Sequence, residues 1–384
     1  DKYKVLSDRN HGFRSGHSCE TQLLTTMQDI YSSFDAGRQT DVIILDFSRA
    51  FDTVPHDKLL HKLEHYGVRG SIHKWLSSFL SQRNMRVVLE GVSSQEVPVE
   101  SGVPQGTVLG PLLFLCHIND LPATVKSTVR LFADDCLLYR EIRSFQDHLT
   151  LQSDLKELES WAATWGMRFN TQKCYVLPTR PKSNYLYTLN NSILQYVQQN
   201  PYLGIQISAD LKWGTHIAGL CKRAGSTLGF LRRNLRSCPQ ECRRLAYVAL
   251  VRSSLEYGSA VWSPYLRCDI DRLETVQRLA ARFIMNDYKT REPGCVGKML
   301  TTLNLPTLEE RRHVNRLTTL YKIVNGLVPA MPAASFLTPA NRERRRVKPT
   351  AYRDCETKNI IQIQVQKNDQ CFKVQHSNTE QYRN

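Results

Sequence analysis

Two adjacent aspartates, Asp134 and Asp135, stand between two short apolar runs of the sequence. Apolar runs on either side of a polar turn predict a β-hairpin with both carboxylates at its tip. Because like charges held side by side repel each other, the pair favours a bound divalent cation, and hard cations prefer carboxylate oxygens. Solvated turns also carry Asp-Asp, so the interpretation depends on which other residues reach this turn.

A third carboxylate, Asp46, follows the continuous apolar run 42–45, which is typical of a strand buried on both faces. Between it and the aspartate pair, residues 101–107 form a glycine loop that opens an apolar helix. Three carboxylates from adjacent strands can hold two Mg²⁺ ions, one to activate an attacking hydroxyl and one to stabilise a leaving pyrophosphate. Nucleotidyl transfer needs this arrangement.

Hydrophobic periodicity predicts the elements that position these residues. Ile72, Trp75, Leu76, Phe79 and Leu80 share helical spacing and are expected to face inward. Helices are expected after Ser18, after Pro55, after Ser71, over 111–118, over a stretch ending at Gly166, and over 215–235, 239–257, 269–286 and 307–325. Strands are expected at 42–45, on both sides of Gly91 (residues 86–90 and 95–99), around the aspartate pair, over 168–177 and within 185–207.

The 384 residues suffice for two or three domains, and 41% hydrophobic with 23% charged residues is typical of a soluble globular protein. The longest apolar stretch, 108–118, is too short to span a bilayer, so no membrane partner is expected. The eleven cysteines are irregularly spaced, which favours reduced thiols in an intracellular protein. Cys116, Cys136 and Cys174 are expected to be small core residues.

The net charge of +15 is concentrated in one half of the chain. Residues 1–207 hold 21 basic and 21 acidic side chains, whereas residues 208–384 hold 30 and 15. This asymmetry favours a catalytic part followed by a part that binds a polyanion, although a solvated basic surface would give the same count. Residues 331–384 are polar and are expected to be disordered.

The chain is similar to reverse transcriptases in three segments. Residues 46–52 (DFSRAFD), 101–106 (SGVPQG) and 132–135 (FADD) resemble the first palm motif, the template and nucleotide loop, and the aromatic-x-Asp-Asp motif of that family. Residues 12–18 (GFRSGHS) and 51–56 (FDTVPH) resemble the enzymes of non-LTR (LINE-type, Jockey-like) retrotransposons.

The resemblance implies an α+β right-hand polymerase with a ferredoxin-like palm sheet and a helical, basic thumb. The expected parts are partial fingers at 1–38, a palm with inserted fingers elements at 39–207, the thumb and following segment at 208–330, and the polar tail at 331–384. The family's upstream fingers segment and an endonuclease domain are not found in the sequence, so we expect an N-terminally truncated element.

The resemblance also implies roles for individual residues. Asp46 and Asp134 would be the principal ligands of two Mg²⁺ ions, for which Mn²⁺ could substitute, and Asp135 the weaker third. Lys173 would contact the triphosphate or protonate pyrophosphate; a surface lysine is the alternative. Phe51 would be the steric gate that rejects a 2′-hydroxyl, or else a core aromatic.

Further residues follow from the same resemblance. The nucleotide and template pocket would include Phe47, Gln105 and Gly106, the primer grip Tyr202, Leu203 and Gly204, and the nucleic-acid contacts Arg14, Lys222, Arg223, Arg232 and Arg233. A plain turn is the alternative for the loop and the grip, and a surface arginine for Arg14. Asp52 and His56 are interpreted as local turn and cap residues.

The sequence therefore predicts an RNA-directed DNA polymerase that acts on an RNA template, a DNA primer and dNTPs, in the nucleus or cytoplasm. It carries no signal for a particular oligomeric state. An intron-encoded or telomere-type polymerase is a second interpretation. A catalytically dead, retroelement-derived RNA-binding protein is the third, because the basic half would suffice for binding.

Overall fold

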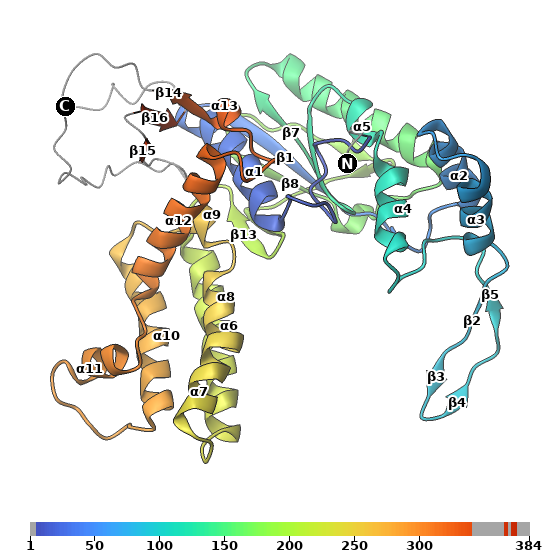
Figure 1. Cartoon of the computed structure of the whole chain (residues 1–384). Helices are drawn as coiled ribbons and strands as arrows, with labels where there is room; N and C mark the ends of the chain where they lie inside the picture. The colour runs from blue at the N-terminus through green and yellow to red at the C-terminus, as the bar shows by residue number, and fades with distance from the viewer. Residues whose placement is uncertain (1–4, 340–364, 368–369, 375–384) are drawn as a thin grey trace. The chain divides into compact units, whose positions relative to one another are not determined.

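The computed structural model describes residues 5–339, 365–367 and 370–374, which form two compact units (Figure 1). The first unit contains Asp1–Gln22 and Ser33–Gln198, and the second contains Leu23–Ser32 and Gln199–Asn384. Residues of helix α1 (Cys19–Asp35) fall in both groups. The division after Gln198 comes a few residues before the boundary expected between 207 and 208.

A five-stranded sheet organises the first unit, with the strand order β11-β8-β1-β7-β6. Its strands are β1 (Gln39–Leu45), β6 (Thr128–Phe132), β7 (Asp135–Ile142), β8 (Tyr175–Thr179) and β11 (Gln195–Tyr196). Every pairing is antiparallel except the one between β11 and β8. Strand β1 is central and almost wholly buried, as its apolar run predicted.

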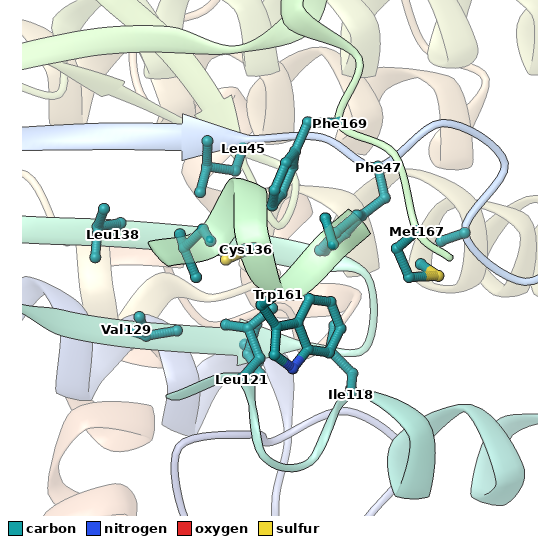
Figure 2. Packing of buried hydrophobic residues seen from close by; sticks show 14 of the residues in the cluster. Leu45, Phe47, Ile118, Leu121, Val129, Cys136, Leu138, Trp161, Met167 and Phe169 are labelled. Atoms are coloured by element: carbon teal, nitrogen blue, oxygen red, sulfur yellow. The ribbon is translucent and has the colours of Figure 1, made fainter. Parts of the chain in front are cut away.

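Helices pack on this sheet to form the main core. They are α2 (His56–His65), α4 (Leu109–Ile118), α5 (Phe145–Trp165) and the 3₁₀ turn η1 (Leu121–Ala123). Figure 2 shows Trp161 of α5 among side chains of the strands, including Leu45 and Cys136. Because Trp161 is fully enclosed, its replacement by alanine would cost about 3–5 kcal/mol. Gly166, with φ of 75°, ends α5 as predicted.

Helix α3 (Gly70–Leu80) buries less of its predicted inner face than expected. Leu76 and Leu80 are buried, but Ile72 and Trp75 are exposed, which corrects the prediction. Leu76 and Leu80 join the main core, and Phe79 packs against it. Trp75 instead stacks on Phe79 of its own helix, with ring centroids 5.5 Å apart.

The hairpin predicted around Gly91 is present as an interrupted ribbon. Its strands are β2 (Asn84–Met85), β3 (Val88–Leu89), β4 (Val92–Ser93) and β5 (Val97–Pro98), with β2 paired to β5 and β3 to β4. Glu90 and Gly91 both have positive φ, 50° and 83°, as two-residue hairpin turns require.

The strand predicted at 168–177 is wrong in its first part. Residues Thr171–Lys173 form the 3₁₀ turn η2, and the strand β8 begins only at Tyr175. Phe169 is joined to Phe47 by an isolated bridge, so the segment is held by local contacts rather than by a continuous ladder. A small hairpin of β9 (Thr188–Leu189) and β10 (Ser192–Ile193) completes the unit.

The second unit is mainly helical, as predicted. It begins with the hairpin β12 (Gln199–Tyr202) and β13 (Ile205–Ser208). Its helices are α6 (Gly214–Asn234), α7 (Gln240–Ala246), the π-helical turn η3 (Tyr247–Arg252), α8 (Ser253–Glu256), α9 (Ser259–Trp262), α10 (Arg267–Met285), α11 (Cys295–Thr302), α12 (Leu308–Val324) and α13 (Ala333–Phe336). The helix predicted at 239–257 is thus one run with a π-helical turn in its middle.

The predicted disorder of the tail is wrong for some residues. Strands β14 (Leu337–Pro339), β15 (Val365–Lys367) and β16 (Gln370–Val374) form a small sheet after α13. The rest of that prediction, at 340–364, 368–369 and 375–384, lies outside the described residues. In the described part of the chain, no helix has the length and apolarity to cross a membrane.

The nine cysteines from Cys19 to Cys295 are free thiols. Cys136 and Cys174 are buried, and Cys116 is half-buried against the core, as expected for small core residues. Burial raises the pKa of the Cys116 thiol to about 11 and that of Cys174 to about 11, so both stay protonated at neutral pH.

Candidate functional site

The three aspartates singled out in the sequence meet at one end of the central strands. The register of β1 and β7 pairs Leu45 with Cys136, so the next position along each strand brings Asp46 level with Asp135. Asp134 lies in the tight turn between β6 and β7, where Phe132 pairs with Asp135. The sheet therefore delivers three carboxylates from two adjacent strands.

The surroundings of Asp134 and Asp135 disfavour the ionised forms of these two carboxylates. The pKa of Asp135 is raised to about 6, first by its removal from water and then by the charges of Asp134 and Asp46. The pKa of Asp134 is also raised, first by burial, with a contribution from the Asp46 charge. The side chains thus lie within electrostatic reach of each other, in a cluster that a cation would stabilise.

The donor set suits a hard divalent cation, although it is not a complete metal site by itself. Within residues 5–339, 365–367 and 370–374, no three His, Cys, Asp or Glu side chains are gathered closely enough to hold a metal ion. Mg²⁺ commonly takes only one or two protein carboxylates and completes its shell with water and substrate phosphates. The oxygen-only set of Asp46, Asp134 and Asp135 fits that mode of binding.

The turn that carries Asp134 is clamped by the N-terminal segment. The Leu131 N–H donates to Arg9 O (2.9 Å) and the His11 N–H to Leu131 O (3.0 Å). The buried Asn10 accepts, at Oδ1, from Gly12 N (3.0 Å) and Ala133 N (3.1 Å). Asn10 was not predicted from the sequence, because a single asparagine gives no periodic or charge signal.

Gly12 explains why the clamp can approach so closely. A Cβ at this position would lie 2.4 Å from the backbone nitrogen of Ala133, so only glycine fits. Ala133 itself has φ of 54°, a left-handed conformation that non-glycine residues rarely adopt. The turn that carries Asp134 is therefore strained, and the N-terminal segment holds it in place from outside the sheet.

The segment before β8 is tied to the backbone of Asp46. The Asn170 N–H donates to Asp46 O (2.8 Å), and the Asp46 N–H donates to Cys174 Sγ (3.4 Å). Lys173 lies between these two anchors, and its side chain is exposed. These anchors hold the segment that carries Lys173 against the backbone of Asp46, and the triphosphate contact of Lys173 stays a prediction.

The prediction that Phe47 lines the nucleotide pocket is wrong for its side chain. The ring is buried and stacks on Phe169, with centroids 4.5 Å apart, and it also faces Trp161 (Figure 2). Phe47 follows a strand that is covered on both faces, so its side chain enters the core. Its role is to fix the chain directly after Asp46.

Phe51 and the glycine loop are joined by a set of hydrogen bonds. The Val103 N–H donates to Phe51 O (2.8 Å), and Gln105 Nε2 donates to Asp52 Oδ1 (2.7 Å). His56 Nε2 lies 2.8 Å from Gly102 O. Asp52 and His56 thus hold the loop, in agreement with their interpretation as local structural residues.

The Phe51 ring is half-buried, with one face stacked on Phe114 at 4.3 Å between centroids. Gln105 and Gly106 are exposed at the tip of the loop. Gly106 has φ of 77°, and no protein atom would lie within 4 Å of an added Cβ. Space beside this glycine is therefore open, which leaves room for a substrate.

The predicted nucleic-acid contact of Arg14 is replaced by an internal role. Its side chain is only 5% exposed, and Nη1 donates to Ser7 O (2.5 Å) and Asn10 O (3.1 Å). The guanidinium thereby braces the N-terminal clamp. The guanidinium donors of Arg14 face backbone carbonyls, because residues 7–10 lie around its side chain. The sequence pattern did not indicate this arrangement.

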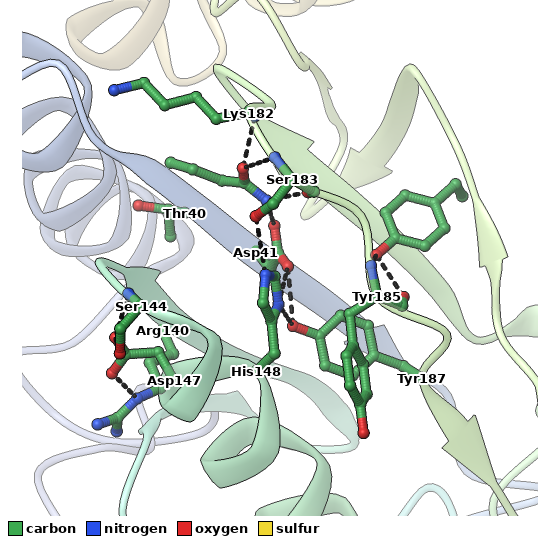
Figure 3. Close-up of polar contacts among 12 residues, drawn as sticks. Thr40, Asp41, Arg140, Ser144, Asp147, His148, Lys182, Ser183, Tyr185 and Tyr187 are labelled. Carbon is green, nitrogen blue, oxygen red and sulfur yellow. Dashed lines mark hydrogen bonds and ion pairs between the residues drawn. The ribbon is translucent and has the colours of Figure 1, made fainter.

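A buried polar cluster lies near the start of β1, away from Asp46 on that strand (Figure 3). His148 Nε2 lies 2.9 Å from Ser183 Oγ, and the Tyr187 hydroxyl donates to Asp41 Oδ2 (2.8 Å). His148 Nδ1 is closer to that hydroxyl (2.7 Å) than to the carboxylate (3.4 Å), and Gln39 Oε1 accepts from Ser183 N (2.9 Å). Because Asp41 and His148 are fully enclosed, the cluster fastens the 182–187 segment to β1.

In the second unit, Tyr202 is the last residue of β12, and Leu203 and Gly204 form the turn that joins it to β13. Leu203 and Gly204 have φ of 46° and 80°. The hydroxyl of Tyr257 donates to Leu203 O (3.0 Å) and so stabilises the turn. Tyr257 was not found from the sequence, because it lies some fifty residues away and only the fold brings it to the turn.

The four predicted basic contacts of the second unit share helix α6. Lys222, Arg223, Arg232 and Arg233 are all exposed, and α6 contains no acidic residue. None of the four forms an ion pair with a carboxylate of the described chain. The opposite face carries the buried Ile217, Leu220, Ala224, Leu228 and Leu231.

The strand-end carboxylates and the glycine loop are linked through residues 46–52, because Asp46 begins this segment and its residues Phe51 and Asp52 bind the loop. The family model described as reverse transcriptase (RNA-dependent DNA polymerase) matches residues 1–207. The chain belongs to the reverse transcriptase family.

Known relatives agree with this assignment and with the predicted resemblance to non-LTR retrotransposon enzymes. The chain is 30% identical over 360 residues to the probable RNA-directed DNA polymerase from transposon BS of Drosophila melanogaster, covering 86% of this chain and 38% of that one. It is 25% identical over 298 residues to the RNA-directed DNA polymerase from mobile element jockey of the same species, covering 74% and 32%. It therefore spans well under half the length of these relatives.

Among solved structures, the chain is similar to apo telomerase from Candida tropicalis. The sequence identity is 12%, the TM-score is 0.44, and the match covers 86% of this chain and 57% of the telomerase chain.

Proposed function

We propose that this chain is an RNA-directed DNA polymerase, which extends the 3′-hydroxyl of a primer with dNTPs on an RNA template in the nucleus or cytoplasm. The observation that carries the proposal is the level placement of Asp46 and Asp135 at the ends of paired strands, with Asp134 in the adjoining turn. The loop bearing Gln105 is bonded to Asp52, within the segment that Asp46 begins.

Asp46 and Asp134 are proposed as the principal ligands of two Mg²⁺ ions, with Asp135 as a third ligand and Mn²⁺ as a possible substitute. When bound, the ions would lower the pKa of the attacking hydroxyl and neutralise charge on the leaving pyrophosphate. The raised pKa values of Asp134 and Asp135 support this, because burial and the neighbouring carboxylates disfavour their ionised forms and a bound cation would favour them. Lys173 is proposed to contact the triphosphate.

Phe51 is proposed as the gate that selects deoxyribose. Its stacking on Phe114 keeps the ring from turning aside, so a 2′-hydroxyl would meet a carbon surface. Such a surface offers the hydroxyl no hydrogen bond, and leaving it unpaired would cost about 1–3 kcal/mol. Replacement of Phe51 by valine should therefore raise incorporation of rNTPs relative to dNTPs.

The second unit is proposed to act as the thumb and to hold the template–primer. The exposed, uncompensated cations of α6 suit a phosphate backbone, and contacts of this kind are largely independent of sequence. The Tyr202–Gly204 turn is proposed as the primer grip. Its support by the Tyr257 hydroxyl would keep it rigid.

Primer extension tests the proposed function directly. Wild-type protein, an RNA template with an annealed DNA primer, dNTPs and Mg²⁺ or Mn²⁺ should give extended primer, and Asp134→Ala should abolish it. Retained RNA binding without any extension by the wild type would instead favour the non-catalytic RNA-binding interpretation. Extension that Asp134→Ala leaves unchanged would refute the metal-ligand assignment.

A further inference from the structure

Phe13 is an aromatic residue in an unfavourable position. Its side chain is 61% exposed, and its backbone has φ of 51°. Exposed aromatic surface does not help the chain to fold, and the left-handed conformation strains any residue with a Cβ. Strained residues of this kind cluster at ligand sites, so the placement of Phe13 needs an explanation.

The backbone sets Phe13 beside the aspartate turn. Gly12, its neighbour, packs so closely against Ala133 that a Cβ would lie 2.4 Å from the Ala133 nitrogen. Asn10 bonds both Gly12 N and Ala133 N, which fixes the segment before Phe13 to the same turn. Because this segment is fixed, the side chain of Phe13 has little freedom to take another direction.

The ring of Phe13 meets the proposed sugar gate. It stands edge-on to Phe51, with centroids 6.3 Å apart and planes at 80°. Phe51 stacks in turn on Phe114 at 4.3 Å. The three rings form a row whose inner end is buried and whose outer end, Phe13, is open to solvent.

We infer that Phe13 is a specificity-determining residue, which forms the outer wall of the sugar pocket of an incoming 2′-deoxyribonucleoside triphosphate. The inference rests on the proposed function, in which Phe51 is the gate. A second ring beside Phe51 excludes water from the 2′ position, so a ribose hydroxyl there would lose its hydrogen bonds without a replacement. Removing the Phe13 ring lets water reach that position and weakens the rejection of rNTPs.

Phe145 provides a matched control in the same unit. It is 65% exposed, begins α5, and stands edge-on to Tyr185 at 5.8 Å between centroids. It shares the residue type, the exposure and the ring contact of Phe13, but it lies at the opposite end of strand β7 from the aspartates. An effect that comes only from the loss of an exposed ring should therefore be equal in Phe13→Ala and Phe145→Ala.

The experiment measures incorporation of a single dNTP and of the matching rNTP on an RNA template, with kcat and KM for each nucleotide. For Phe13→Ala, we expect KM for the dNTP to rise more than kcat falls, and the dNTP/rNTP selectivity to drop by about tenfold, the scale of removing one apolar group from a pocket. Phe13→Tyr should lower selectivity as well, because its hydroxyl can pair with a 2′-hydroxyl. Phe145→Ala should match the wild type in both quantities.

A failure of the proposed function can be distinguished from a failure of the inference about Phe13. Wild-type protein that extends no primer would overturn the proposed function and this inference with it. Normal extension, with wild-type selectivity in Phe13→Ala and Phe13→Tyr, would overturn only the inference. Thermal melting of each variant identifies a folding defect, and Phe13→Tyr, which keeps the ring, decides the question if Phe13→Ala does not fold.

Discussion

At the scale of single residues, the site depends on groups that carry no charge. Asp134 stands in a turn whose preceding residue, Ala133, has a left-handed backbone. Asn10 supplies the acceptor that holds this backbone in place. The sequence pattern reveals the carboxylates, whereas their geometry depends on the side-chain amide of Asn10, which lies far away in the sequence.

Replacement of Asn10 by alanine should therefore damage the site. Two buried N–H groups, of Gly12 and Ala133, would lose their acceptor, at about 1–3 kcal/mol in the free energy of unfolding. Primer extension should fall by more than this loss of folded protein explains, because the Asp134 turn relaxes. Denaturant titration and single-turnover extension measure the two effects.

Gln39→Ala serves as the control for Asn10. Gln39 Oε1 also accepts from two backbone N–H groups, those of Lys182 (2.6 Å) and Ser183 (2.9 Å), but Gln39 begins β1 and so lies at the opposite end of this strand from Asp46. We expect a similar loss of stability with extension per folded molecule unchanged. Equal losses of extension in both variants would show that Asn10 has only a general structural role.

His117 gives a pH dependence at the same scale. Its fully buried ring has a pKa lowered to about 4, first by burial and then by the Lys62 charge. Above pH 6.5 the ring is neutral in both folded and unfolded chains. As pH falls from 6.5 to 4, only the unfolded chain takes up the proton, so the folded state loses stability.

His117→Phe should remove this effect. Between pH 6.5 and 4, the difference in unfolding free energy between variant and wild type should move in favour of the variant by about 1.4 kcal/mol per pH unit. The Lys62 contact is retained, because Lys62 Nζ donates to the His117 backbone oxygen. A difference that stays constant over this range would contradict the assignment.

At the scale of elements, the 101–107 loop is shaped by two glycines with different constraints. Gly102 and Gly106 both have positive φ, 88° and 77°. A Cβ on Gly102 would lie 2.7 Å from Asp52 O, whereas one on Gly106 would meet no protein atom within 4 Å. The first glycine serves the fold, and the second leaves space for a ligand.

Alanine at each glycine separates these roles. Gly106→Ala should cost about 1 kcal/mol, from the backbone conformation alone, and should raise KM for the incoming nucleotide. Gly102→Ala suffers the same strain and a backbone clash, so it should be clearly less stable. Denaturant unfolding and nucleotide titration distinguish them; equal stabilities, or an unchanged KM in Gly106→Ala, would contradict this account.

The sequence predicted the helices and strands better than the contacts of their side chains. The buried strand β1, the aspartate turn and the Gly166 helix end follow from local patterns and were confirmed. The orientations of Phe47, Trp75 and Arg14 were missed. Periodicity indicates which side chains share a face, but it does not show which neighbour covers that face or where a long side chain finds its acceptors.

At the scale of the whole molecule, the carboxylate cluster and the basic face of α6 lie in different units. The carboxylate cluster belongs to the first unit and the uncompensated cations of α6 to the second. The charge asymmetry of the sequence predicted this division. The exact boundary, and the grouping of residues 23–32 with the second unit, depend on long-range packing that a local pattern cannot show.

The basic face of α6 should control the salt dependence of nucleic-acid binding. Glutamine at Lys222, Arg223, Arg232 and Arg233 should weaken binding to an RNA–DNA duplex. The slope of log K against log salt should also become shallower, by about 0.9 for each phosphate that the protein no longer neutralises. Fluorescence anisotropy over a salt series measures this slope.

Arg267 and Arg272 provide the matched control for α6. They form ion pairs with Asp271 (3.0 Å) and Asp269 (3.2 Å), so their charges are already offset. Glutamine at both should leave the slope close to that of the wild type. An equal decrease per substitution in both sets would mean that binding follows net charge and not the α6 face.

Asp46 and Asp134 are proposed to act together as metal-binding catalytic residues. Single-turnover primer extension on an RNA template, measured over a range of Mg²⁺ concentrations, tests this claim most directly when Asp46→Asn and Asp134→Asn are compared with Asp52→Asn. Each of the first two should lose at least about a thousandfold in rate, the scale set by loss of strong transition-state charge stabilisation. Asp52→Asn, which only loosens the Gln105 loop, should keep measurable, Mg²⁺-dependent extension. Extension at the wild-type rate by Asp46→Asn or Asp134→Asn would contradict the claim.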